Sequence, residues 1–569
     1  SRYLVYICRQ ILCAASSILS LSNPTSFVLT IITRSRYRMV PYMLCFQFVA
    51  CCLLVLLYSL RSGSTSSAGH GPRSYPVIGC LLAFYENRRR LLDWYTEMLS
   101  ASPTQTIVVD RLGARRTVVT ANPANVEYIL LGNFGNYPKG KPFTDVLGDL
   151  LGNGIFNVDG DKWFAQRKLV SHEFSARTLR ELEIAVLEAE ALDRLVPAME
   201  AAAEPGGGAV DMQDVLRRFA FDVICRVSLG VDPGCLDPAL PAPRLATAFD
   251  AAAGIIARRG AAPLAAVWKI KRALNIGSER RLREEVQVIH EAVMDLIRSR
   301  KKERFLVNAG DVRNDLLSRM IDCGYADEDI RDMVISFIMA GRDTTSSALT
   351  WFFWLLMRHR DVERDVLEEI TSMRRDSSNG TYTGEGFDLD DFRRMRVLHA
   401  ALSETMRLYP PVAWDSKHAA AADVLPDGTR VASGDRVTYF QYGMGRMEAI
   451  WGSDAGEFSL ERWLALPADG NAASGGVSPF KYPVFQGGPR TCLGREMAFV
   501  QMKFVAGAIL RRFDLRPVDE GRTPAFLPLL TSHMHGGLKV TVRRRKVEST
   551  TGNALHDAAT DKSRSSFFS

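Results

Sequence analysis

A single cysteine stands just before a predicted helix in the segment YPVFQGGPRTCLGREMAFVQMKF, residues 482–504. The free backbone N–H groups at a helix N-terminus lower the pKa of a thiol and stabilise its thiolate. The Cys492 thiolate can therefore act as a nucleophile or as a metal ligand. A nucleophile needs a base, and no histidine lies close in the sequence, although one can lie close in space. Ligation of a heme iron needs only this sulfur and a cradle for the heme propionates.

The residues around the cysteine fit such a cradle. Gly488 and Gly494 allow tight backbone turns that direct N–H groups at the sulfur, and Arg490 supplies a positive charge for a carboxylate. Together with Phe485 and Cys492 they follow the spacing FxxGxRxCxG. A buried structural cysteine is the alternative reading for Cys492 alone, and this spacing argues against it.

A second constellation lies inside a predicted helix, residues 329–359, where a polar cluster interrupts two apolar runs. Polar groups within a buried helix are costly unless they are paired or useful. Gly341 weakens the helix there, and the hydroxyl of Thr344 or Thr345 can compete for a backbone carbonyl and open a local groove. A polar kink without chemistry is the alternative.

The third constellation is ALSETMRLYPP, residues 401–411, in which Glu404 and Arg407 share one helix face. The two prolines that follow end that helix. The segment FSLERWL supplies Arg462 about 50 residues later. An exposed ion pair is the ordinary reading of such a pattern when it stands alone.

These three motifs resemble those of the cytochrome P450 superfamily. The resemblance implies heme b (iron protoporphyrin IX) with Cys492 as its axial iron ligand and O2 as co-substrate. It further implies that Asp343 and Thr344 of AGRDTT relay protons, and that Ala340 and Gly341 leave room above the heme. Glu404, Arg407 and Arg462 would then form a buried structural cluster that supports the cysteine loop. This chain has Leu460 where the family commonly has proline, so a looser local turn is expected.

The resemblance also suggests partners for the heme propionates and for electron transfer. Trp163 and Arg167 match the family's WxxxR pattern, and His418 stands where relatives often place a basic residue; all three can instead be ordinary surface residues. No dinucleotide-binding motif appears, so electrons must come from NADPH through NADPH-cytochrome P450 reductase. We expect that partner to dock on the cysteine side, through the basic residues Arg495, Lys503, Arg511 and Arg512.

Between residues 75 and 542 the sequence is most similar to the plant fatty-acid ω-hydroxylase group, nearest to family ninety-four. That group hydroxylates terminal carbons of fatty acids, and some members act on jasmonoyl-isoleucine. Segments that line the pocket in relatives supply Phe337, Met339, Val412, Ala413, Leu530 and Met534, for which plain core packing is the alternative. Lys139 and Lys141 are candidates for binding the substrate carboxylate.

Two other functions stay open at this stage. A heme-thiolate isomerase or dehydratase of fatty-acid hydroperoxides would need neither O2 nor a reductase, and should lack the acid–alcohol pair that this chain has at Asp343 and Thr344. A catalytically inactive heme-binding paralogue is the second alternative, which the three intact motifs disfavour.

Composition is consistent with a large folded enzyme. The chain has 569 residues, 47% hydrophobic and 24% charged, and a net charge of +7 spread along its length, which does not indicate a nucleic-acid partner. Half of its ten cysteines lie in the first 60 residues, and their spacing matches neither a disulfide framework nor a zinc site. A reducing, cytosol-facing compartment fits this usage.

The elements that must position the motifs are mainly helical. Helices are expected at 161–200, 211–230, 279–303, 327–370 and 391–409, a strand pair at 104–120, and short strands within 418–440. The predicted fold is mainly α with a minor antiparallel β part, the cytochrome P450 fold, in a single large catalytic domain.

The expected order along the chain starts with residues 1–38 as an upstream extension of the gene model. Residues 39–60 are uncharged for 22 positions and fit a transmembrane anchor; 61–74 form a linker, 75–545 the heme-thiolate monooxygenase domain, and 546–569 a disordered tail. The resemblance implies a single-pass protein in the lipid bilayer of the endoplasmic reticulum, with its catalytic domain in the cytosol.

Overall fold

The computed structural model describes residues 71–175, 177–237, 244–262, 264–306, 315–376, 387, 389–465 and 476–545. Within these ranges, no helix combines the length and the apolarity needed to cross a membrane. The predicted extension, anchor and tail lie outside them, as does most of the predicted linker. Arg73–Gly79 belongs to a small N-terminal unit, whose described part is a turn closed by a bridge between Tyr75 and Gly79.

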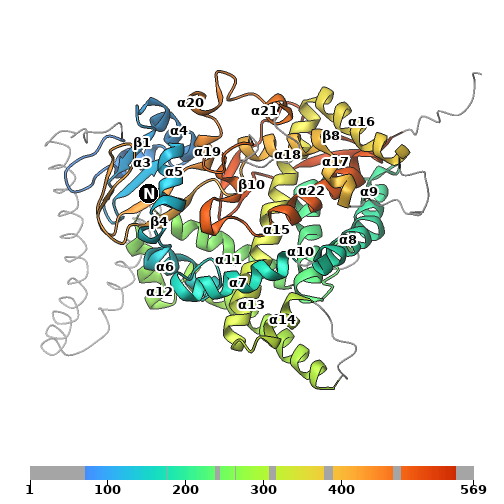
Figure 1. Cartoon of the computed structure of the whole chain (residues 1–569), viewed down its shortest axis with the longest axis horizontal. Helices are drawn as coiled ribbons and strands as arrows, with labels where there is room; N and C mark the ends of the chain where they lie inside the picture. The colour runs from blue at the N-terminus through green and yellow to red at the C-terminus, as the bar shows by residue number, and fades with distance from the viewer. Residues whose placement is uncertain are drawn as a thin grey trace, which may run out of the picture. The chain divides into compact units, whose positions relative to one another are not determined.

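The main unit comprises Ser66–Pro72 and the chain from Cys80 onward, and its described part is built mostly from helices (Figure 1). Its described helices are α3 (Leu81–Glu86), α4 (Leu91–Ala101), α5 (Pro123–Glu127), α6 (Gly140–Leu151), α7 (Gly160–Ser175), α8 (Arg177–Glu190), α9 (Val196–Ala203), α10 (Met212–Leu229), α11 (Arg244–Gly260), α12 (Ala265–Leu274), α13 (Ser278–Leu306), α14 (Leu316–Asp322), α15 (Asp327–Arg358), α16 (Arg360–Asp376), α17 (Leu389–Arg394), α18 (Arg396–Leu408), α19 (Gln441–Met444), α20 (Glu448–Trp451), α21 (Glu461–Leu464) and α22 (Arg495–Leu510). The helices predicted at 211–230 and 279–303 are confirmed as α10 and α13.

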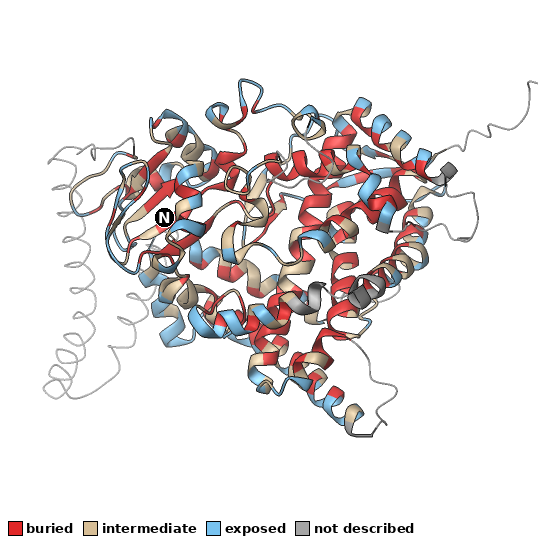
Figure 2. Ribbon diagram, in the orientation of Figure 1, coloured by how far each residue is buried: buried red, intermediate tan, exposed pale blue. Residues whose placement is uncertain are grey.

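Helix α15 runs through the middle of the main unit and is buried along most of its length (Figure 2). Three acidic residues in its first turn suit the positive end of the helix dipole. Residues 327–370 are helical as predicted except at His359, where α15 ends and after which α16 begins at Arg360; the central helix expected at 329–359 is α15. The apolar side chains of α15 are buried on all sides, whereas α16 is strongly amphipathic and must lie at the surface, so the chain has to turn between them.

Four small sheets complete the main unit. Their strands are β1 (Thr106–Val109), β2 (Thr117–Thr120), β3 (Val210–Asp211), β4 (Asp415–His418), β5 (Asp423–Val424), β6 (Arg430–Val431), β7 (Arg436–Tyr439), β8 (Phe513–Pro517), β9 (Phe526–Pro528), β10 (Ser532–Met534) and β11 (Lys539–Arg544). They pair in the orders β1-β2-β7-β4, β3-β11-β8, β10-β9 and β5-β6. The strand pair predicted at 104–120 is confirmed as the antiparallel pair β1 and β2.

The β part is not wholly antiparallel as predicted, since β2 and β7 pair in parallel with Thr117 opposite Arg436. A parallel pair needs a long crossover connection, and here most of the helical body lies between the two strands in sequence. Strand β7 then pairs antiparallel with β4, so that Arg436 lies opposite His418. This sheet forms one side of the cavity described next.

Candidate active site

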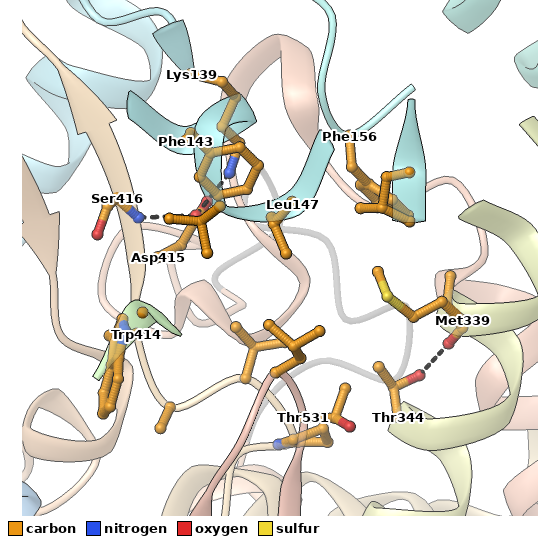
Figure 3. A pocket seen from close by; sticks show the side chains of 18 of the residues that line it. Lys139, Phe143, Leu147, Phe156, Met339, Thr344, Trp414, Asp415, Ser416 and Thr531 are labelled. Atoms are coloured by element: carbon orange, nitrogen blue, oxygen red, sulfur yellow. Dashed lines mark hydrogen bonds and ion pairs between the residues drawn. The ribbon is translucent and has the colours of Figure 1, made fainter. Parts of the chain in front are cut away.

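A cavity of about 670 Å³ lies inside the main unit, between α15, α6, strand β4 and the cysteine loop. Figure 3 shows Met339 and Thr344 of α15 on one side of it and Ser416 of β4 on the opposite side. The structure brings most of the predicted site residues to its wall: Trp163, Arg167, Phe337, Met339, Ala340, Gly341, Thr344, Val412, Ala413, His418, Phe485, Arg490, Cys492, Gly494 and Leu530.

Cys492 precedes α22 and opens into this cavity, which is why its side chain is solvent-accessible although it lies inside the protein. Its N–H donates to the carbonyl of Phe485 at 2.8 Å, which closes the loop. Gly488 has φ +62°, and a Cβ there would lie 2.1 Å from the carbonyl oxygen of Leu130, so only glycine fits.

The prediction that the protein's own groups lower the pKa of Cys492 is wrong. Burial raises the pKa of this thiol, and the N–H of Gly494 with the charges of Arg167 and Arg495 lowers it by less. The expected donors are thus in place, but removal from water outweighs them. A metal ion bound at the sulfur would deprotonate it outright.

Basic and aromatic side chains gather beside the cysteine. The Arg490 guanidinium lies 4.5 Å from the ring centroid of Trp163 and forms an ion pair with Asp159 at 2.7 Å. Arg167 donates to the carbonyl of Thr491 at 2.5 Å, and burial lowers its pKa. The tryptophan and the two arginines, predicted from two distant motifs, therefore form one cluster.

His418 lines the cavity in a neutral form. Its Nδ1 lies 2.6 Å from the carbonyl oxygen of Lys139, and burial lowers its pKa to about 4. A neutral imidazole can donate one hydrogen bond, but it cannot supply the positive charge that its predicted role suggested.

The sequence analysis missed a buried group of charges next to His418. The Asp415 carboxylate accepts from Lys139 at 2.6 Å, from Lys417 at 3.2 Å and from the Tyr439 hydroxyl at 2.7 Å. Burial would raise the pKa of Asp415, but the two lysines hold it well below its usual range. Burial, together with repulsion from Lys139 and Arg490, lowers the pKa of Lys417 to about 7. The local sequence gave no clear signal, because DSKH contains no apolar residue and the burial of β4 is seen only in the structure.

Of the two lysines predicted as candidates for binding the substrate carboxylate, only Lys139 lies on the cavity wall. Lys139 lines the cavity but is already paired with Asp415. Lys141 has a side chain 84% exposed and pairs with Asp145 on the next turn of α6. The prediction for Lys141 is wrong because Lys139, just before α6, faces inward, whereas Lys141, two positions later in its first turn, faces solvent.

In the middle of α15, Thr344 faces the cavity, whereas its neighbour Asp343 does not. The Thr344 hydroxyl faces the cavity and donates to the Ala340 carbonyl at 2.5 Å. Asp343 is buried but is not part of the cavity wall; its carboxylate lies 3.7 Å from Arg342, which also pairs with Asp250 at 2.7 Å. One carboxylate oxygen of Asp343 has no hydrogen-bond partner among the described residues.

Gly341 also has a packing role that the sequence analysis did not predict. A Cβ at this position would lie 2.6 Å from the side chain of Ile224 on α10. The missing side chain therefore lets α10 and α15 pack closely. Gly341 and Ala340 both lie on the cavity wall.

The third motif forms a cluster in which Glu404 and Arg407 are fully buried and Arg462 is partly exposed. Glu404 holds the Arg407 guanidinium with two contacts of 2.6 and 2.7 Å, and Arg462 lies 3.4 Å away. Trp463, which the sequence analysis did not single out, donates its indole N–H to Glu404 at 2.8 Å. The turn at Leu460 is closed by hydrogen bonds from Trp463 and Leu464 to its carbonyl, so the absence of proline does not loosen it.

Two residues predicted to be accessible, Met534 in the cavity and Lys503 at the docking surface, are buried. Met534 is 2% exposed and packs in the hydrophobic core instead of lining the cavity, because Ser532 and Met534 share the inner face of β10. Lys503 is 5% exposed, and its ammonium donates to the carbonyl of Phe392, so it cannot meet a docking partner. Arg495 remains exposed, and Arg511 and Arg512 are half-buried.

Comparison with known proteins gives one family. A family model described as Cytochrome P450 matches residues 70–538. Cytochrome P450 94B3 of Arabidopsis thaliana is 54% identical over 498 residues, covering 87% of this chain and 96% of that protein. Cytochrome P450 94A1 of Vicia sativa is 42% identical over 477 residues, covering 83% of this chain and 90% of that protein.

A solved structure agrees on the fold. The crystal structure of the cytochrome P450DA heme domain superposes with a TM-score of 0.66 at 21% identity and covers 84% of this chain and 97% of that one. This chain therefore belongs to the cytochrome P450 family, among the plant members numbered 94, and is a monooxygenase that uses heme b, O2 and electrons that a reductase takes from NADPH.

Proposed function

We propose that this monooxygenase hydroxylates the terminal (ω) carbon of a fatty acid or of a fatty-acid-derived conjugate such as jasmonoyl-isoleucine. The observation that carries the proposal is one enclosed cavity in which the Cys492 sulfur, the Thr344 hydroxyl and a set of large apolar side chains meet. A volume of about 670 Å³ lies within the usual range of small-molecule sites.

The residues present fit heme b. Cys492 would bind the iron, since its sulfur opens into the cavity and receives the Gly494 N–H. Arg490, Arg167 and the indole of Trp163 would hold the propionates, whose negative charge suits these donors. When bound, the heme supplies the oxidising chemistry that inserts one oxygen atom of O2 into a C–H bond. Asp159 accepts a hydrogen bond from Arg490 at 2.7 Å.

Selectivity for the terminal carbon requires the protein to keep interior carbons away from the reacting centre, because secondary C–H bonds are weaker than primary ones. Phe337 and Met339 of α15, Leu147 of α6 and Leu530 provide apolar surface that would confine an alkyl chain. Phe156 also lines the cavity (Figure 3). A confined, dry channel also excludes water from the reaction.

Proton delivery would fall to Thr344 and Asp343. The Thr344 hydroxyl stands at the cavity wall, and its hydrogen bond to the Ala340 carbonyl fixes its orientation. Asp343 lies behind it, buried, with one carboxylate oxygen that accepts no hydrogen bond from the described residues and is 3.7 Å from Arg342. Reorientation of that carboxylate toward Thr344 would connect the cavity to the Arg342–Asp250 pair.

The cellular setting belongs to the same proposal. We infer a single-pass protein of the endoplasmic reticulum membrane, on the basis of the apolar segment 39–60. NADPH-cytochrome P450 reductase would approach the cysteine side, where Arg495 is exposed next to the loop.

The test uses microsomes that contain the full-length protein and the plant reductase. They are incubated with lauric acid and, separately, with jasmonoyl-isoleucine, and mass spectrometry locates the new hydroxyl group. We expect NADPH-dependent ω-hydroxylation of at least one of them, and none with Cys492→Ala, which should also lose the carbon-monoxide difference spectrum of a thiolate-bound heme. Rearrangement of a fatty-acid hydroperoxide without NADPH would instead support the isomerase or dehydratase alternative.

A further inference from the structure

Two arginines on the cavity wall have no acidic partner in the part of the chain that the structure describes. Arg111 follows strand β1 and Arg436 begins strand β7, and both line the cavity. Neither forms an ion pair with any residue that the structure describes, although acidic side chains nearby are paired: Asp415 with Lys139, and Asp435 with Arg116.

Most of the hydrogen-bonding capacity of these two guanidiniums is unused. Arg436 donates its Nε–H to the Ser416 hydroxyl at 2.9 Å, which fixes the orientation of the guanidinium. Arg111 reaches only the carbonyl of Ala262 at 3.4 Å and lies over the ring of Phe84 at 4.0 Å. The Nε of Arg111 is buried without a partner among the described residues. A guanidinium has five N–H donors, so both can still bind an anion.

The electrostatic surroundings favour an anion here. Burial lowers the pKa of both guanidiniums; for Arg436, Tyr95 and the Asp415 carboxylate raise the pKa in part, and the charge of Arg111 lowers it. Arg115 lies on the exposed turn between β1 and β2 and also lines the cavity. Like charges in a partly enclosed site are unfavourable unless a counter-charge is present, so a bound carboxylate would stabilise this arrangement.

The position of these arginines suits the head of a long substrate. Ser416, the partner of Arg436, lies across the cavity from Thr344 (Figure 3). The turn that carries Arg115 is exposed, which places this end of the cavity next to solvent. An acid held here would keep its carboxylate near water and extend its alkyl tail toward α15.

We propose that Arg111 and Arg436, assisted by Arg115, bind the carboxylate of the substrate and so set which carbon reaches the reacting centre. This inference rests on the proposed ω-hydroxylation of a fatty acid or conjugate. It also replaces Lys139 and Lys141 as anchors, since both lysines are already paired with aspartates.

A heme propionate carries the same carboxylate chemistry and is the competing occupant, because Arg436 lies opposite His418 in the paired strands. The substrate is favoured for two reasons. Arg490, Arg167 and Trp163 already form a cluster beside Cys492 that suits the propionates. Arg111 and Arg115 belong instead to the turn after β1, where the cavity meets solvent.

The test compares Arg436→Gln and Arg111→Gln with Arg543→Gln, an exposed arginine on β11 outside the cavity. Each full-length variant, solubilised in detergent, is titrated with lauric acid and with 1-dodecanol, which has the same chain but no carboxylate. The change in the heme absorption band gives both dissociation constants, and the heme content is measured for every variant.

Loss of a charge-assisted hydrogen bond should weaken laurate binding by about 10-fold to 100-fold, with dodecanol binding nearly unchanged. Arg543→Gln should match the wild type for both ligands. Hydroxylation should also spread from the terminal carbon of laurate to its neighbours in the cavity variants.

Three results would overturn the inference. One is an equal loss of affinity for laurate and dodecanol, and another is no loss for either. The third is a fall in heme content confined to Arg436→Gln or Arg111→Gln, which would assign these arginines to a propionate. The titration does not depend on turnover, so a protein that binds laurate through the arginines but hydroxylates neither laurate nor jasmonoyl-isoleucine would refute the proposed function and leave this inference supported.

Discussion

Replacement of Glu404 by glutamine tests how the buried ExxR cluster supports the cysteine loop. One carboxylate oxygen accepts from the Arg407 Nη2 at 2.6 Å and from the Ser459 N–H at 3.0 Å. The other accepts from the Arg407 Nε at 2.7 Å and from the Trp463 indole at 2.8 Å. A glutamine keeps one oxygen, so in either orientation its NH2 group faces two donors.

The expected cost follows from the burial of the pair. Both side chains of the Glu404–Arg407 pair are 0% exposed, so the substitution leaves a guanidinium in the core without its counter-charge. Removal of one partner of a buried ion pair costs about 3–5 kcal/mol. Arg407 would keep its hydrogen bonds to the carbonyls of Ala455 and Glu457. These bonds should keep the loss of unfolding free energy within about 3–5 kcal/mol.

The effect should reach the heme site through aromatic packing. Trp463 stacks edge-on against Tyr482 at 4.8 Å between ring centroids, and the Tyr482 hydroxyl donates to the Ser403 carbonyl at 2.9 Å. Tyr482 immediately precedes the turn Pro483–Phe485, whose last residue accepts the Cys492 N–H. We therefore expect Glu404→Gln to lose heme as well as stability.

Urea unfolding of the heme-loaded protein measures the free energy, and the carbon-monoxide difference spectrum measures intact ligation. Glu97→Gln is the matched control, because Glu97 forms an ion pair with Arg90 whose side chains are 58% and 48% exposed. That change should cost less than about 1 kcal/mol. A Glu404→Gln protein that unfolds at the same urea concentration as Glu97→Gln would show that the cluster does not stabilise the loop.

Three other substitutions test separate parts of the structure. Thr344→Ala should consume NADPH with at least about tenfold less product per NADPH, since a positioned proton donor contributes about 100-fold or more; unchanged coupling, measured by product yield against NADPH oxidation, would exclude the relay. Lys503→Met should raise the free energy of unfolding at pH 7 by roughly 1–2 kcal/mol, because burial lowers the pKa of Lys503 to about 8 and its bond to the Phe392 carbonyl offsets only part of that cost. The Lys503 amine binds its proton more tightly in the unfolded chain than in the folded one, so the wild type should gain stability as the pH rises from about 8 to 10.5. The difference in unfolding free energy between Lys503→Met and the wild type should therefore shrink over that range. A constant difference in urea unfolding would contradict this reasoning. Gly488→Ala should destabilise the protein by at least about 1–3 kcal/mol, since alanine is strained at φ +62° and its Cβ would meet the Leu130 carbonyl oxygen; thermal unfolding equal to that of the wild type would show that the loop can shift at no cost.

The sequence alone determined the family and the chemistry, because these depend on local patterns. The spacing around Cys492 is read along one short segment, and the ExxR pair lies on one turn of one helix. Helix periodicity also predicted α10 and α13, since amphipathic faces repeat along the chain whatever they pack against.

Only the tertiary structure decided which neighbouring residue faces the cavity. Lys139 and Lys141 differ by two positions, yet one is buried against Asp415 and the other is in solvent. Asp343 and Thr344 are adjacent, yet only Thr344 reaches the cavity wall. The rotation of a helix about its axis is set by the elements that pack on it, so it cannot be read from local sequence.

The arginine pair depends even more on the fold. Arg111 and Arg436 are more than 300 positions apart, and they meet because β2 and β7 pair in parallel across most of the chain. No local pattern marks either residue, since an arginine next to a short strand is usually exposed. Among the described residues, their lack of acidic partners is a property of the assembled cavity, because it depends on where Asp415 and Asp435 lie and on which side chains already bind them.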